Sequence, residues 1–211
     1  MENGGAVSMF VKICGLNSLE AVQAAVDAGA DALGFVFADS PRQVTPEQAV
    51  ELTRDLPAGI ARVAVMLHPT SEEWNAVRDI FKPDWLQTDQ ADFAALDMPD
   101  AIGRFPVYRD KLASDFDNDD IAWPEHILFE GARSGVGLQP DWEHAAQIAH
   151  RTCLMLAGGL SPDNVRDAIT HVHPWGVDVS SGVELSPGVK DLGKIAAFVV
   201  AAKEAEGAHA G

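Results

Sequence analysis

The chain has 211 residues, of which 47% are hydrophobic, and it carries a formal net charge of −17 at pH 7. This length suits one domain of the larger kind, and no apolar run is long enough to span a bilayer. The negative charge makes nucleic acid and anionic membrane surfaces poor partners, although an anionic small molecule can still be held by local backbone N–H groups and a few cations.

The two cysteines, Cys14 and Cys153, lie far apart without metal-type spacing, so the sequence indicates neither a disulfide framework nor a zinc site. Residues 1–8 lack the basic and apolar regions of a signal peptide. We therefore expect a cytoplasmic protein.

Strand-like and helix-like segments alternate along the first half of the chain. The apolar, strand-like runs are Met9–Cys14, Ala32–Phe37, Arg62–Leu67, Trp85–Thr88 and Pro106–Arg109. The helical segments between them are Leu19–Ala28, Pro46–Leu56, one that follows Thr70, and a weak one around Phe93–Leu96. The stretch Ser114–Asp120 is acidic and irregular, and no helix is predicted there.

Helix-start signals support these segments. Asn17 with Glu20 and Thr70 with Glu73 have the spacing of a capping box, in which each side chain bonds the other residue's backbone N–H. Thr45 is a predicted N-cap because Pro46 follows it at the first helical position.

The alternation continues in the second half. The predicted strands are Ile127–Glu130, Cys153–Leu156 and Val177–Ser180. The predicted helices are Trp142–His150, one capped by Ser161 with Pro162 in its first turn, and Leu192–Ala205.

About eight strand–helix units in this length predict a (β/α)₈ TIM barrel, an α/β fold, as one domain over residues 1–211. The ends, 1–8 and 207–211, are expected to be flexible. A doubly wound open sheet is the alternative, but its G-x-G-x-x-G fingerprint after the first strand is missing.

Active sites of such barrels lie at the carboxyl ends of the strands. This rule separates the polar residues that are candidates for the site from those at the opposite, structural end of the barrel. The residues at predicted strand ends are Cys14, Asp89, Glu130, Gly158, Gly159, Ser180, Ser181 and Gly182. Cys153 begins its strand and belongs to the opposite face, so the two cysteines are not expected to meet.

Lys12 and Cys14 share one face of the first strand, because side chains alternate along a strand. The eighth strand lies beside the first in a closed barrel, and Asp178 and Ser180 share one of its faces. We expect a Lys12–Asp178 ion pair inside the barrel, because a lone buried charge is costly. Lys12 would also ease ionisation of the neighbouring thiol.

Two glycine-containing turns predict a phosphate site. Gly158 and Gly159 follow one strand, and Ser180-Ser181-Gly182 ends the last one, with Val183-Glu184 opening a short helix. Glycine lets backbone N–H groups approach an anion closely, and barrel phosphate sites typically use the loops after strands seven and eight.

Several sequence blocks together resemble the phosphoribosylanthranilate isomerase family. The blocks, in chain order, are Val11-Lys12-Ile13-Cys14-Gly15, Ala30-Asp31-Ala32-Leu33-Gly34-Phe35-Val36-Phe37, Ser40-Pro41-Arg42, Ala157-Gly158-Gly159-Leu160 with Asn164-Val165, Val177-Asp178-Val179-Ser180-Ser181-Gly182-Val183-Glu184, and Pro187-Gly188-Val189-Lys190-Asp191. The resemblance runs from end to end of the chain and is strongest at both ends.

The resemblance implies a cofactor-free barrel that isomerises N-(5′-phosphoribosyl)anthranilate to the corresponding aminoketose in tryptophan biosynthesis. An acid protonates the ribose ring oxygen, the ring opens to a Schiff base, and a base removes the proton from the second sugar carbon. The family's base corresponds to Cys14. The family's acid is an aspartate whose place is taken by Glu130 in Leu128-Phe129-Glu130.

The resemblance also implies binding roles at the same rim. Arg42 would meet the anthranilate carboxylate with its guanidinium, and Arg109 and Arg133 are weaker candidates for that anion. The family's fourth strand usually ends in L-Q-L-H-G, and this chain has Leu86-Gln87-Thr88-Asp89-Gln90 there. Gln87 therefore matches the family, whereas Asp89 stands where the family usually has histidine.

The expected partner is a small phosphorylated substrate, with no cofactor and no metal, and the chain is expected to be a monomer or homodimer. Two alternatives remain open: a divergent relative that isomerises another ribosyl-phosphate amine, and a phosphate-binding barrel without catalysis.

His171 and His173 form an H-x-H pattern but precede Pro174 on the face away from the site, so we interpret them as surface residues. Trp142 is interpreted as structural, and the loop Arg133–Gln139 has the small residues that closure over substrate would need.

Overall fold

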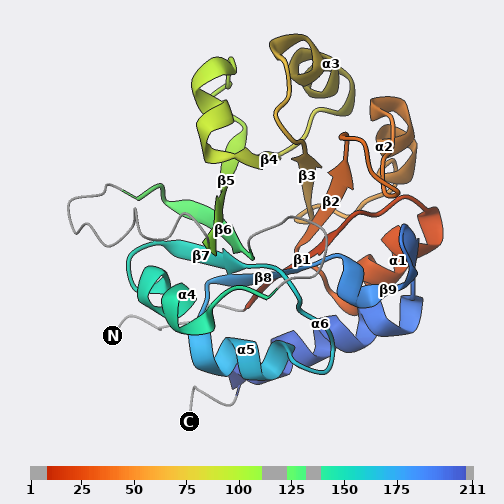
Figure 1. Cartoon of the computed structure of the whole chain (residues 1–211). Coiled ribbons are helices and arrows are strands. Elements are labelled where there is room, and N and C mark those ends of the chain that lie inside the picture. Colours follow the sequence, from red (N-terminus) through yellow and green to blue (C-terminus); the bar gives the residue numbers. More distant parts are fainter. Residues whose placement is uncertain (1–8, 111–122, 132–138, 208–211) are drawn as a thin grey trace, which may run out of the picture.

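The computed structural model describes residues 9–110, 123–131 and 139–207. Eight parallel strands form a closed barrel in sequential order, with β8 paired to β1 (Figure 1). The strands are β1 Phe10–Cys14, β2 Ala32–Val36, β3 Ala61–Val65, β4 Trp85–Asp89, β5 Gly103–Arg109, β6 His126–Glu130, β7 Cys153–Leu156 and β8 Gly176–Val179. The predicted (β/α)₈ barrel is confirmed, and the open-sheet alternative is wrong because the β1–β8 pairing closes the sheet.

Helices surround the barrel in Figure 1, and they follow most of the strands. The α-helices are α1 Leu19–Ala28, α2 Pro46–Leu52, α3 Ser71–Phe81, α4 Trp142–Ala149, α5 Val165–Val172 and α6 Leu192–Gly207. The remaining elements are the 3₁₀ helices η1 Gln90–Ala95 and η3 Ser181–Val183 and the hairpin strands β9 Glu184–Ser186 and β10 Val189–Lys190. Within the described residues, no helix is both long and apolar enough to cross a membrane.

Two of the predicted caps are wrong and two are confirmed. Thr45 and Thr70 each form a capping box, with Gln48 and Glu73. The cap of α1 is Ser18, whose hydroxyl accepts from Ala21 N–H, because the helix begins at Leu19 and Asn17 is one residue too early. The Asn17 side chain instead donates to the Gly188 carbonyl at 3.0 Å.

The helix expected at Ser161 begins later, at Val165, with Asn164 as its N-cap. The Ser161 hydroxyl accepts from Asp163 N–H, so it supports the turn that precedes the helix rather than the helix itself. Helix α2 is also shorter than predicted and ends at Leu52. Pro57 disfavours helical conformation at Leu56, the predicted last residue, because a residue that precedes proline is pushed away from that conformation.

The barrel interior is filled with apolar side chains up to its amino-terminal end. Ala32, Val63, Phe105, Leu128 and Met155 are buried in one cluster inside the barrel. Phe10, Trp85 and Trp175 pack against this cluster, and two aromatic pairs stack with ring centroids about 4.5 Å apart, namely Phe10 with Trp175 and Trp85 with Phe105. This filling leaves the carboxyl end of the barrel as the place for a cavity.

Some predictions concern residues outside the described part of the chain. These are the irregular stretch Ser114–Asp120, most of the loop Arg133–Gln139, and the flexible ends at 1–8 and 208–211. Gly207, which was expected to belong to the frayed tail, is the last residue of α6.

Candidate active site

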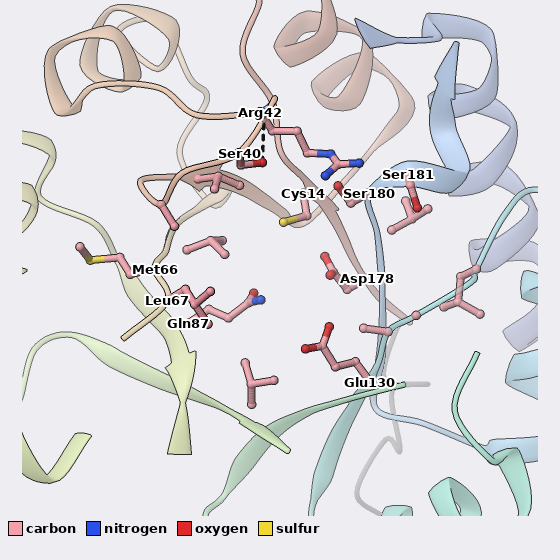
Figure 2. A pocket seen from close by; sticks show the side chains of 18 of the residues that line it. Cys14, Ser40, Arg42, Met66, Leu67, Gln87, Glu130, Asp178, Ser180 and Ser181 are labelled. Atoms are coloured by element: carbon pink, nitrogen blue, oxygen red, sulfur yellow. Dashed lines mark hydrogen bonds between the residues drawn. The ribbon is translucent and has the colours of Figure 1, made fainter. Parts of the chain in front are cut away.

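The carboxyl ends of the strands surround a cavity of about 340 Å³. Its lining brings together every predicted site residue except Lys12, namely Cys14, Arg42, Gln87, Asp89, Glu130, Gly158, Gly159, Asp178, Ser180, Ser181 and Gly182. In Figure 2, Cys14, Asp178, Glu130 and Gln87 point from different strands toward one central space. The barrel therefore gathers residues from both ends of the sequence.

Lys12 lies beneath this cavity and is fully buried. Its Nζ is 2.8 Å from Asp178 Oδ1, which confirms the predicted ion pair. The two residues are register partners in the strand pairing that closes the barrel. Burial disfavours the charged amine, but Asp178 and Cys14 outweigh that effect, so the pKa of Lys12 is raised and the residue stays protonated.

Cys14 is the last residue of β1 and is buried. Burial raises the pKa of the Cys14 thiol, and the positive charge of Lys12 opposes that rise without cancelling it. The neutral thiol is therefore the resting form. Since the thiolate is the reactive form, Cys14 acts as a base only in the fraction of molecules in which it is ionised.

Arg42 is held across the rim by a buried carboxylate. Its Nε and Nη2 donate to Glu184 Oε1 and Oε2 at 2.7 and 2.9 Å. Lys190 Nζ donates to Glu184 Oε1 at 3.0 Å and to the Ser180 carbonyl at 2.9 Å. Burial raises the pKa of Glu184, but the two cations outweigh it and the pKa is lowered overall, so the carboxylate stays ionised. In Figure 2 the guanidinium reaches from the loop after β2 toward Ser180.

The predicted phosphate loops lie side by side. Gly158 and Gly159 both have positive φ, +89° and +66°, which favours glycine at these two positions. The Asn164 side chain fixes this turn by donating to the Gly159 carbonyl and accepting from Ser161 N–H. A Cβ at Gly182 would overlap the Leu160 carbonyl, so the loops after β7 and β8 form one continuous surface.

Glu130, the last residue of β6, faces an arginine on the neighbouring strand. Arg109 ends β5, its Nε lies 3.3 Å from Glu130 Oε1, and its Nη1 donates to Asp89 Oδ2 at 2.7 Å. Asp89, the residue at the family's usual histidine position, is thus paired with a cation. The pKa of Arg109 is raised, chiefly by the hydrogen bond to Asp89, so its charge is retained.

Gln87 ends in the cavity as well, and its amide faces the central space in Figure 2. Its Oε1 is buried and has no hydrogen-bond partner within the described part of the chain. Since buried polar atoms are normally paired, this oxygen is suited to accept a hydrogen bond from a bound molecule.

Three buried residues position the site but have no individual role in the sequence interpretation, where they appear only as members of the blocks that carry the resemblance, namely Gly34, Glu184 and Lys190. A Cβ at Gly34 would lie 3.1 Å from both Cys14 Sγ and Lys12 Nζ. A glycine inside an apolar strand is a signal of such a close approach. Apart from their place in those blocks, the sequence does not show that Glu184 and Lys190 are buried, because charged residues are mostly exposed.

Other candidates lie away from the cavity. His171 and His173 are exposed, as predicted, and His171 pairs with Glu143 on α4. Cys153 begins β7 at the opposite end of the barrel. Among the described residues, no group of three or more His, Cys, Asp or Glu side chains is arranged to hold a metal ion.

Comparison with known proteins matches residues 11–201 to the family model of N-(5′-phosphoribosyl)anthranilate (PRA) isomerase. The N-(5′-phosphoribosyl)anthranilate isomerase of Roseiflexus castenholzii is 42% identical, with 93% of this chain and 99% of the relative covered. The isomerase of Listeria welshimeri is also 42% identical, with 94% and 100% covered.

Crystal structures of the same family share the fold. Phosphoribosyl anthranilate isomerase from Thermotoga maritima is 32% identical with a TM-score of 0.79, with 93% of this chain and 99% of that chain covered. A second structure, with 30% identity, a TM-score of 0.74 and the same coverage, is a complex with reduced 1-(o-carboxyphenylamino)-1-deoxyribulose 5-phosphate. A third, with 30% identity, a TM-score of 0.75 and again the same coverage, is of monomers generated from the dimeric Thermotoga maritima protein.

Proposed function

This chain belongs to the N-(5′-phosphoribosyl)anthranilate isomerase family, and we propose that Cys14 and Glu130 carry out the proton transfers of the family's reaction. The reaction converts N-(5′-phosphoribosyl)anthranilate, an aminoaldose phosphate, to 1-(2-carboxyphenylamino)-1-deoxyribulose 5-phosphate in tryptophan biosynthesis. The observation that carries the assignment of roles is that a thiol from β1 and a carboxyl from β6 line one cavity, between loops suited to a phosphate.

The two groups divide the chemistry between them. Glu130 in its protonated form gives a proton to the ribose ring oxygen, and the ring opens to a protonated Schiff base. The Cys14 thiolate then removes the proton from the second sugar carbon, and the electron pair of that C–H bond neutralises the iminium. The resulting enol converts to the ketone. Each step moves a proton and needs no redox partner.

The remaining cavity residues bind and orient the substrate. The loops at Gly158-Gly159 and Ser180–Gly182 face the phosphate with backbone N–H groups, which suits an anion in a protein of net charge −17. Arg42, fixed by Glu184, meets the anthranilate carboxylate with the part of its guanidinium that Glu184 does not contact. Gln87 Oε1 accepts a hydrogen bond from a sugar hydroxyl.

Two other functions fit the cavity less well. A relative that isomerises another ribosyl-phosphate amine would share the phosphate loops but need no Arg42 for an aryl carboxylate. A binding barrel without catalysis would have no use for a thiol and a carboxyl that face the same space. We place the active protein in the cytoplasm as a monomer or homodimer.

The test of this function is a kinetic comparison of two cysteine variants. Cys14→Ala should lower kcat for N-(5′-phosphoribosyl)anthranilate by at least about 10³-fold, since the base is lost. Cys153→Ala is the matched control and should keep wild-type kinetics, because Cys153 lies at the other end of the barrel. A folded Cys14→Ala protein with near-normal kcat would refute the role of Cys14. An inactive wild-type protein that still binds phosphate would favour one of the two other functions.

A further inference from the structure

One guanidinium lies between two carboxylates at the rim of the cavity. Arg109, Asp89 and Glu130 belong to three adjacent strands, and Arg109 and Glu130 are register partners in the β5–β6 pairing. All three line the cavity, with side-chain exposures of 19%, 17% and 11%. At this depth their charges interact more strongly than charges on the protein surface.

The two contacts of Arg109 are unequal. The contact to Asp89 is a hydrogen bond of 2.7 Å from Nη1, whereas Nε approaches Glu130 Oε1 only to 3.3 Å. Arg109 is therefore neutralised mainly by Asp89, and its hold on Glu130 is the weaker one. A full ion pair with Glu130 would keep that carboxyl ionised and unfit to donate a proton.

We propose that Arg109 is a positioning residue for Glu130, and that Asp89 adjusts how strongly Arg109 favours the ionised form of this carboxyl. Before ring opening, Asp89 and Arg109 cancel each other's charge, so Glu130 can hold its proton. After Glu130 gives up the proton, Arg109 stabilises the carboxylate that is left. The inference rests on the proposed role of Glu130 as the acid.

Other charged groups around Glu130 are the same in every variant compared below. Asp178 of β8 and Cys14 of β1 line the same cavity, and Lys12 lies beneath them, paired with Asp178. Arg42 and Asp39 lie across the cavity in the loop after β2. Behind Asp89, His68 and Asp92 continue the cluster, since His68 Nδ1 is 3.1 Å from Asp92 Oδ1 and its Nε2 is 3.7 Å from Asp89 Oδ2.

The test follows the titration of the Glu130 carboxyl by ¹³C NMR in the free enzyme, with Glu130→Gln used to assign its signal. Arg109→Gln should move the midpoint up by about one pH unit, because a nearby positive charge is removed. Asp89→Asn should move it down, because Arg109 loses its main counter-charge. In the Arg109→Gln background, Asp89→Asn should lower the midpoint clearly less than it does alone, since most of its effect acts through Arg109 and only the direct repulsion between the two carboxylates remains.

Kinetics and a matched control complete the test. Arg109→Gln should lower kcat by about tenfold through loss of orientation, with a smaller change in KM. Arg104→Gln removes the same charge from the exposed start of β5 and should change neither the titration nor kcat. A raised KM with an unmoved Glu130 midpoint would overturn the inference and make Arg109 a substrate-binding residue.

The failure of this inference is distinct from failure of the proposed function. Unmoved midpoints together with an inactive Glu130→Gln variant would overturn only the role of Arg109. An active Glu130→Gln variant would refute Glu130 as the acid, and the inference would fall with it.

Discussion

At the scale of single residues, the charge around Cys14 differs from the simplest expectation for a reactive thiol. A lysine lies beside it, but that lysine is paired with Asp178, and burial raises the pKa of the thiol more than Lys12 lowers it. The site therefore keeps a neutral thiol at rest. A neutral thiol reacts more slowly than a thiolate, so we expect oxidation and alkylation of Cys14 to be slow in the free protein.

This protonation state predicts slow alkylation of Cys14 at neutral pH. In a Cys153→Ala background, the rate of Cys14 alkylation by iodoacetamide should rise with pH, with a midpoint above the ordinary thiol range of about 8.5. The midpoint lies higher because a raised pKa lowers the thiolate fraction at any given pH, and only the thiolate reacts quickly. Mass spectrometry of the labelled peptide measures the rate, and a midpoint below that range would show that Lys12 prevails over burial.

At the scale of elements, the pairing of β1 with β2 determines where the thiol can lie. Cys14 and Gly34 are register partners, and the missing side chain of Gly34 leaves the space that Cys14 Sγ and Lys12 Nζ use. The role of Gly34 in the strand is therefore to have no side chain, so that its neighbours can occupy that space. The sequence shows the glycine, but not which neighbour needs its space.

Gly34→Ala should therefore reduce activity more than stability. A Cβ 3.1 Å from Cys14 Sγ and from the end of Lys12 is tighter than a normal contact, so the thiol and the lysine have to shift by a few tenths of an ångström. We expect kcat to fall by about tenfold, because proton transfer depends on geometry at the ångström scale. Circular dichroism should show an intact fold. Gly193→Ala, on the exposed start of α6, is the control and should keep kcat, and an unchanged kcat in a folded Gly34→Ala protein would show that the thiol does not depend on this space.

At the scale of the whole molecule, the alternation of strands and helices predicted the barrel, because the hydrophobic periodicity of each strand and helix can be recognised within its own short segment. The barrel in turn predicted that Lys12 and Asp178, 166 positions apart, would meet at the β1–β8 closure. In an eight-stranded barrel the eighth strand must pair with the first. Once the sequence indicates eight strands, Lys12 and Asp178 are expected on adjacent strands.

Other features could not be predicted in the same way. The Arg109 contacts depend on side-chain angles at three strand ends, which spacing along the chain does not fix. The cap at Asn17 was wrong because the adjacent Ser18 accepts from the first turn of the helix, while Asn17 bonds Gly188 instead. The cap at Ser161 was wrong because the helix begins four residues later, at Val165, and the Ser161 hydroxyl bonds within the turn before it. Sequence patterns locate elements to within a few residues, whereas a cap needs one particular residue.

The central claim is that the barrel brings Cys14 and Glu130 into one cavity as base and acid. The most direct test is the ratio of kcat/KM for N-(5′-phosphoribosyl)anthranilate between Glu130→Gln and the parent protein. The amide keeps the shape of the side chain but has no proton of suitable acidity, so the account predicts a fall of about 10²- to 10⁴-fold. A ratio within about threefold of one in a folded variant would contradict it, since a general acid accounts for far more than that.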